Sequence, residues 1–127
     1  MSDTPRRRWI GRWILVVGVL HALLGFGIYI DSVVAVIRER LWNTVNDTVQ
    51  GRPLAFWFIA AGFLVALAGA LTSWIEARLE PPRFLGWTLL GFAAVGIVMM
   101  PVSGFWLLLP PGVALVARRV RAARNLP

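Results

Sequence analysis

The chain has 127 residues, of which 58% are hydrophobic and only 15% are charged, and its mean hydropathy is +0.72. Soluble domains carry charged residues at about a quarter of their length, so this composition indicates an integral membrane protein and leaves no room for a large soluble domain. The net charge of +7 does not indicate nucleic-acid binding, because the arginines stand at the ends of apolar segments, and the lack of cysteine excludes disulfides and thiol chemistry.

The first predicted element is a membrane span over residues 9–30, which follows a polar, basic tail. Residues 13–30 carry no charge, and the run reaches span length when Trp9 to Gly11 are included and Arg12 extends its side chain to the membrane surface. His21, the only histidine of the chain, stands near the middle of this span.

An amphipathic helix is predicted next, over residues 31–46, with Asp31 as its N-cap. Arg38 lies on one face of this helix, and the apolar positions that recur at helical spacing are Val34, Ile37, Leu41 and Val45. Such a helix is expected to lie on the outer membrane surface; the alternative is a lid over the mouth of the helix bundle.

Three more spans are predicted in the rest of the chain, the first of them over residues 53–75. Residues 84–117 also carry no charge, and as one helix this run would be about 50 Å long, too long for a single crossing of a membrane core of about 30 Å. The run must therefore fold back at the turn-forming segment from Pro101 to Gly104, which gives spans over residues 84–100 and 104–118.

Two adjacent prolines, Pro110 and Pro111, stand inside the fourth predicted span. They would remove the helix hydrogen bonds to the carbonyls of Trp106 and Leu107 and kink the span. Because those carbonyls need partners in lipid, the alternative is a polar pocket just below the outer surface.

Arginine and tryptophan predict the orientation of the spans. Ten arginines flank one set of span ends and three flank the other, so both termini are expected in the cytoplasm. The tryptophans near the predicted inner ends are Trp9, Trp13, Trp74 and Trp87, and those near the outer ends are Trp57 and Trp106. The similar openings RWIG and RFLG, and FWFI and FWLL, suggest a duplicated hairpin with parallel repeats, unless the aromatic belts alone create the match.

Small residues recur every three or four positions in the first two spans. They are Gly18, Ala22 and Gly25 in the first, and Gly62, Ala66 and Ala70 in the second. Such series let helix backbones approach closely, which predicts packing within a bundle or, as the alternative, a homodimer.

The segments RRWIGRWILVVGVLHALLGFG, PLAFWFIAAG and PRFLGWTLLGFAAVGIVMMPVSGFWLLLPP resemble a family of small four-span bacterial membrane proteins known only as a domain of unknown function. More distantly the chain is similar to the DoxX-like four-helix proteins, some of which are subunits of quinone-linked oxidoreductases. The resemblance implies a bacterial inner-membrane protein and brings no catalytic residues with it.

The sequence as a whole predicts an all-α integral membrane protein. Residues 1–127 form a single domain, in which a four-helix transmembrane bundle carries one outer amphipathic helix.

No pattern of catalytic residues is present in the sequence, so an enzyme acting alone is not expected. The candidate ligand-binding residues are His21, Tyr29, Trp57, Ser103 and Trp106. His21 has three interpretations: hydrogen bonding within the bundle, binding of a small ligand such as a quinone, and ligation of haem or a metal, for which Met99 or Met100 would have to supply a second ligand. No metal site is predicted from the sequence.

The predicted function is that of an accessory component that binds lipid or quinone, without catalysis of its own. The alternative is a redox or transport protein built around His21, with haem, quinone or proton chemistry. The expected partners are membrane lipid and either a larger membrane complex or a second copy of the chain.

Overall fold

A computed structural model describes residues 9–45 and 51–124 of the chain. These residues form five α-helices and one 3-10 helix and contain no strand, which confirms the all-α prediction. In chain order the elements are α1 (Ile10–Ile28), α2 (Ile30–Arg38), α3 (Arg52–Arg78), α4 (Arg83–Met99), the 3-10 helix η1 (Gly104–Leu108) and α5 (Leu109–Arg124).

The chain divides into two compact units, and each is described by itself. The first consists of Met1–Ile14 together with Gly69–Pro127, and the second consists of Leu15–Ala68. The second unit holds most of α1, all of α2 and the first part of α3, whereas the first unit holds the α4–η1–α5 hairpin.

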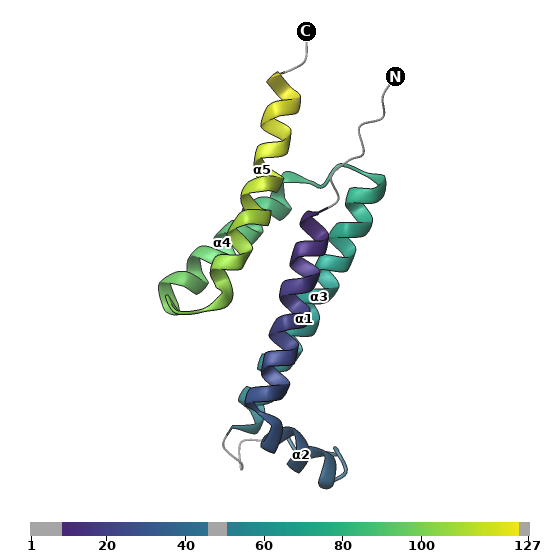
Figure 1. The fold of residues 1–127 in the computed structure, drawn as a ribbon, viewed down its shortest axis with the longest axis vertical. Helices are drawn as coiled ribbons and strands as arrows, with labels where there is room; N and C mark the ends of the chain where they lie inside the picture. The colour runs from purple at the N-terminus through teal and green to yellow at the C-terminus, as the bar shows by residue number, and fades with distance from the viewer. Residues whose placement is uncertain (1–8, 46–50, 125–127) are drawn as a thin grey trace. The chain divides into compact units, whose positions relative to one another are not determined.

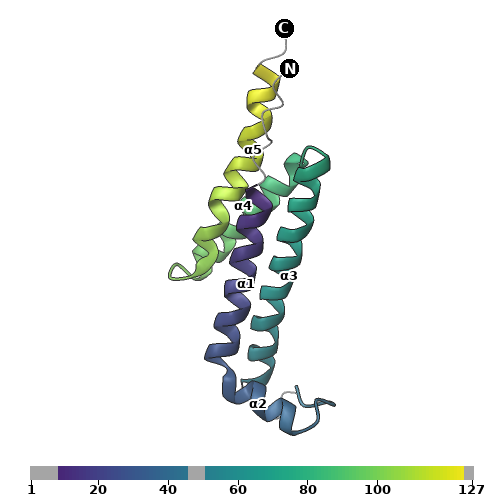
Figure 2. The same cartoon turned by 45° about the vertical axis from the view of Figure 1, so that its right-hand side comes forward.

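Small residues hold α1 and α3 together in the second unit, where the two helices run side by side (Figures 1 and 2). A side chain on Gly18 would collide with the backbone of Ala66, and a Cβ on Gly62 would lie 2.6 Å from the nitrogen of Ala22. Gly25 makes room in the same way for Ile59 and Phe58. The prediction of close intramolecular packing through these residues is confirmed.

The amphipathic helix is shorter than predicted. α1 ends at Ile28, Tyr29 breaks the helix, and α2 then covers only Ile30–Arg38 and leaves the end of α1 in a new direction (Figure 2). Asp31 is not the N-cap: Tyr29 holds that position without a side-chain hydrogen bond, and Asp31 lies in the first turn of the helix. Residue 46, the predicted end of the helix, lies outside the described residues.

A hairpin of α4, η1 and α5 forms the main part of the first unit, and the turn predicted at Pro101 to Gly104 is confirmed (Figure 1). Gly96 of α4 lies directly against the ring of Phe105, so any side chain there would collide with it. Further along the hairpin, a Cβ on Gly86 would lie 3.0 Å from Cβ of Leu115, and Leu90 fills the space at Gly112.

The prediction that two prolines kink the fourth span is wrong. The chain after Ser103 forms a 3-10 helix, and α5 begins only at Leu109, so Pro110 and Pro111 lie in its first turn. Proline is well tolerated there, because the first N–H groups of a helix have no partner within it.

Both carbonyls near these prolines have hydrogen-bond partners. The carbonyl of Trp106 accepts from the N–H of Leu109, and that of Leu107 accepts from Nε1 of Trp13 at 2.8 Å. This contact with the residue after Trp106 does not fit the prediction that Trp13 and Trp106 lie near opposite ends of the spans.

Two helices, and not four, are long and apolar enough to cross a membrane in the described part of the chain. These are Ile10–Ile28 and Arg52–Arg78, whereas Arg83–Met99 and Gly104–Ala117 are shorter apolar segments. With 17 residues, α4 extends about 26 Å. The fourth predicted span begins with the five residues of the 3-10 helix η1 and not with an α-helix.

The two segments proposed as repeats differ in local structure. Phe56 and Trp57 lie inside the α-helix α3, whereas Phe105 and Trp106 lie in the 3-10 helix η1. The equivalence of the two aromatic pairs is therefore not seen at the level of the backbone, and the parallel repeat stays a prediction.

Candidate functional site

His21 belongs to a cluster of three rings in the second unit. Its imidazole stacks on the ring of Phe58 of α3, with ring centroids 4.1 Å apart and an angle of 17° between the planes. The ring of Tyr29 contacts the same phenylalanine at 5.6 Å. Because Gly25 leaves space beside Phe58, that ring fits between α1 and α3. The cluster brings together two predicted ligand-binding residues, His21 and Tyr29.

Nε2 of His21 is buried and has no hydrogen-bond partner among the residues that the structure describes. The stacking on Phe58 shows that the imidazole faces α3. The predicted hydrogen bond from another span is not present at this atom. A buried polar atom without a partner costs about 1–3 kcal/mol, so Nε2 is a position where a ligand atom would be stabilising.

The other three candidate residues make contacts of their own. Trp57 is 66% exposed and contacts Phe56. Ser103 and Trp106 both stabilise the hairpin turn: Oγ of Ser103 donates to the carbonyl of Met100 at 2.6 Å, and Nε1 of Trp106 donates to the carbonyl of Pro101 at 2.9 Å. Both side chains thus have backbone partners within the turn, and their role in ligand binding stays a prediction.

Glu76 is a buried carboxylate that the sequence analysis passed over. Its residue is only 2% exposed, and Oε2 accepts a hydrogen bond from the backbone N–H of Gly11 at 2.8 Å. The first N–H groups of a helix lack partners within it and carry partial positive charge, so a carboxylate stabilises the start of α1. Gly11 permits this contact, since a Cβ there would lie 2.7 Å from Cβ of Ser73.

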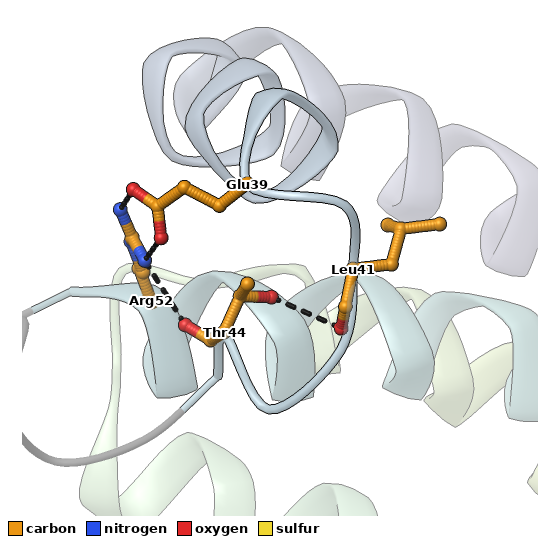
Figure 3. Close-up of polar contacts among 4 residues, drawn as sticks. All are labelled: Glu39, Leu41, Thr44 and Arg52. Carbon is orange, nitrogen blue, oxygen red and sulfur yellow. Dashed lines mark hydrogen bonds and ion pairs between the residues drawn. The ribbon is translucent and has the colours of Figure 1, made fainter.

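A second polar contact missed from the sequence joins the end of α2 to the start of α3 (Figure 3). Arg52 is 8% exposed and pairs with both carboxylate oxygens of Glu39, at 2.7 and 2.6 Å. Its Nη1 also donates to the carbonyl of Thr44 at 3.1 Å, and Oγ1 of Thr44 donates to the carbonyl of Leu41 at 3.2 Å. We call these three residues, Glu39, Thr44 and Arg52, the Arg52 clamp.

The Arg52 clamp predicts a titration that can be measured. The hydrogen bonds from Arg52 hold the pKa of Glu39 below its ordinary value. The stabilisation is therefore fully present above the ordinary carboxyl pKa and is lost as the pH falls through the lowered value. The Cδ chemical shift of Glu39 in the labelled protein is expected to titrate below the ordinary range. Arg52→Gln should restore an ordinary midpoint, and a midpoint that this variant leaves unchanged would contradict the clamp.

The described residues thus define an all-helical protein with two helices that could cross a membrane. The chain belongs to a family of unknown function, DUF6463, whose model matches residues 5–122. No curated protein and no solved structure matches the chain. The family membership agrees with the resemblance noted in the sequence, whereas the more distant likeness to the DoxX-like proteins stays a prediction.

Proposed function

We propose that this protein is an accessory component of a bacterial inner membrane that binds a quinone at His21 and has no catalysis of its own. Its location in a membrane is supported by the exposed surfaces of the two long helices. Only 17% of the most apolar window of α3 and 33% of that of α1 are buried within the protein. A core helix of a soluble protein would be mostly buried, so lipid is the environment that suits these surfaces.

The α4–α5 hairpin is embedded in the same membrane in this proposal, so that four apolar helices share it. The contact between Trp13 and Leu107 lies one turn into α1, near the end that the basic tail precedes. This contact favours a hairpin that enters from the cytoplasmic side. A turn that dips into the membrane is tolerated where its backbone polar groups have partners, as Ser103 and Trp106 supply here.

In this proposal both termini lie in the cytoplasm, and the loop before α3 lies in the periplasm. Arginine clusters at the cytoplasmic ends, and the guanidinium of Arg78 lies 4.5 Å from the ring centre of Trp74, a pairing suited to an interface.

Reporter fusions at residues 3 and 125 should be active as cytoplasmic reporters, and one at residue 46 as a periplasmic reporter. A periplasmic reporter signal from residue 125 would mean that the hairpin does not return.

The quinone site is proposed on the unpartnered Nε2 of His21, the observation that carries this function. A quinone carbonyl accepts a hydrogen bond from Nε2–H, and the hydroxyl of a quinol donates to Nε2 in the other tautomer, so both redox forms have a partner. The aromatic rings of Phe58 and Tyr29 suit a flat apolar ligand. Because Nε2 is buried, the side chains around it must move for the ligand to enter.

This site would bind and orient a quinone without transferring electrons itself. The redox chemistry would belong to the bound quinone and to a partner in a larger membrane complex. A second copy of the chain is the other partner considered, and a redox or transport function at His21 remains the alternative outcome of the test.

His21→Leu is expected to abolish quinone binding without destabilising the fold, because the buried Nε2 has no hydrogen-bond partner to lose. Wild-type and variant protein in nanodiscs would be incubated with decylubiquinone, and the retained quinone measured after separation. Ser103→Ala tests the rival location at the hairpin turn and should retain binding.

Three results would contradict this function. The first is equal retention of quinone by wild type and His21→Leu, and the second is loss of quinone only in Ser103→Ala. The third is a Soret absorption band that His21→Leu removes, which would instead assign His21 to haem.

A further inference from the structure

The loop after α2 has an unusual backbone. Arg40, Leu41 and Asn43 all have positive φ, at 67°, 66° and 51°, although none of them is glycine. Left-handed backbone costs a residue with a side chain about 1–2 kcal/mol. Such conformations persist only where surrounding contacts impose them, and they gather at functional segments.

Hydrogen bonds show how the strained loop forms. The N–H groups of Leu41 and Arg40 donate to the carbonyls of Val36 and Ile37, which is the Schellman arrangement with arginine in the position that glycine usually takes. Trp42 N–H then donates to the carbonyl of Arg40 at 2.8 Å, a γ-turn around Leu41 of the rare, strained kind. The chain therefore reverses within a few residues after α2.

The reversal places two large apolar side chains at the surface of the second unit. Leu41 is 66% exposed and Trp42 is 90% exposed. The Arg52 clamp fixes both ends of this loop, because Arg52 bonds to Glu39, which precedes the pair, and to Thr44, which follows it (Figure 3). A buried arginine thus stabilises a loop conformation that exposes a tryptophan.

We propose that Leu41 and Trp42 form a membrane anchor that inserts into the headgroup region of anionic phospholipids in the outer leaflet. This inference rests on the proposed membrane location. The loop lies between the end of α2, which follows α1 directly, and the start of α3, so it stands at the level where the two crossing helices leave the membrane. Indole rings prefer this interface, and the exposed Arg38 and Arg40 beside the pair complement lipid phosphates.

The absence of cysteine from the sequence makes a site-specific test simple. Trp42→Cys, labelled with an environment-sensitive fluorophore, would be reconstituted into vesicles of phosphatidylcholine and phosphatidylglycerol, with shallow nitroxide lipids as quenchers. We expect blue-shifted emission and strong quenching, both weaker in pure phosphatidylcholine. Adding Arg52→Gln or Glu39→Gln should return the emission toward its value in water, whereas Arg83→Gln, which removes an arginine outside the clamp, should have no effect.

A second label at Leu23→Cys, on a lipid-facing position of α1, separates this proposal from the membrane location itself. If the label at residue 23 lies in lipid and that at residue 42 lies in water, the anchor is refuted and the membrane location stands. If the label at residue 23 also lies in water, the proposed membrane location fails. Emission at residue 42 that depends on the protein-to-lipid ratio, and not on lipid charge, would indicate a second copy of the chain as the occupant and overturn the lipid anchor.

Discussion

Replacing Gly18 by alanine is expected to lower the free energy of unfolding by about 3 kcal/mol, at the upper end of the usual cost of overpacking. The added Cβ would collide with the backbone nitrogen of Ala66 and lie 2.7 Å from its Cα and 2.8 Å from the carbonyl carbon of Val65. Backbone atoms cannot rotate away as a flexible side chain can. The helices α1 and α3 would therefore have to separate, which unfolding in mixed detergent micelles would detect.

Gly27→Ala is the matched control in the same helix, because no other part of the described chain comes within 4 Å of the position where its Cβ would stand. Alanine favours a helix over glycine by about 0.5–1 kcal/mol, so this variant should be unchanged or slightly more stable. Equal stability of the Gly18 and Gly27 variants would contradict the close contact between α1 and α3.

Glu76→Ala is expected to cost about 2–4 kcal/mol, the combined effect of a buried N–H without its partner and the loss of negative charge at a helix start. The N–H concerned is that of Gly11, whose hydrogen bond to Oε2 is 2.8 Å long. Beyond the lower stability, hydrogen exchange in the first turn of α1 should become faster than in the middle of that helix.

Glu76→Gln provides the internal comparison for this prediction. Glutamine keeps an oxygen that accepts the hydrogen bond from Gly11 but carries no charge, so its effect should be smaller than that of alanine. A glutamine variant as unstable as the alanine variant would show that the charge, and not the hydrogen bond, dominates. Wild-type exchange at the start of α1 in the alanine variant would refute the capping role.

Local patterns in the sequence predict the helices and their packing well. An uncharged run indicates a helix in lipid, and small residues at helical spacing indicate where two backbones meet, as Gly18 and Gly62 do. The turn between α4 and α5 is likewise signalled by neighbouring proline, serine and glycine.

Contacts between residues far apart in the chain are not signalled in this way. The partner of Glu76 is a backbone N–H 65 positions earlier, and Glu39 stands 13 positions before its partner Arg52. The end of α2 was missed for a related reason: its C′ position holds Arg40 where the usual signal is glycine. The predicted kink at Pro110 and Pro111 was wrong because the effect of a proline depends on where its helix begins. Since η1 ends at Leu108, α5 begins at Leu109 and both prolines lie in its first turn.

Of the five candidate ligand-binding residues, two proved to be neighbours. His21 and Tyr29 are eight positions apart on a broken helix and meet only through Phe58, which comes from α3. Only the position of that third ring brings them into one cluster, and no pattern in the first span indicates it.

Photocrosslinking with an azido-quinone in native membranes tests the quinone site most directly. After irradiation and digestion, the label should lie on the segments that carry His21 and Phe58, and an excess of unlabelled quinone should suppress it. His21→Leu should lose this labelling. Labelling of the α4–α5 hairpin near Ser103, or labelling that unlabelled quinone does not suppress, would contradict the proposed site.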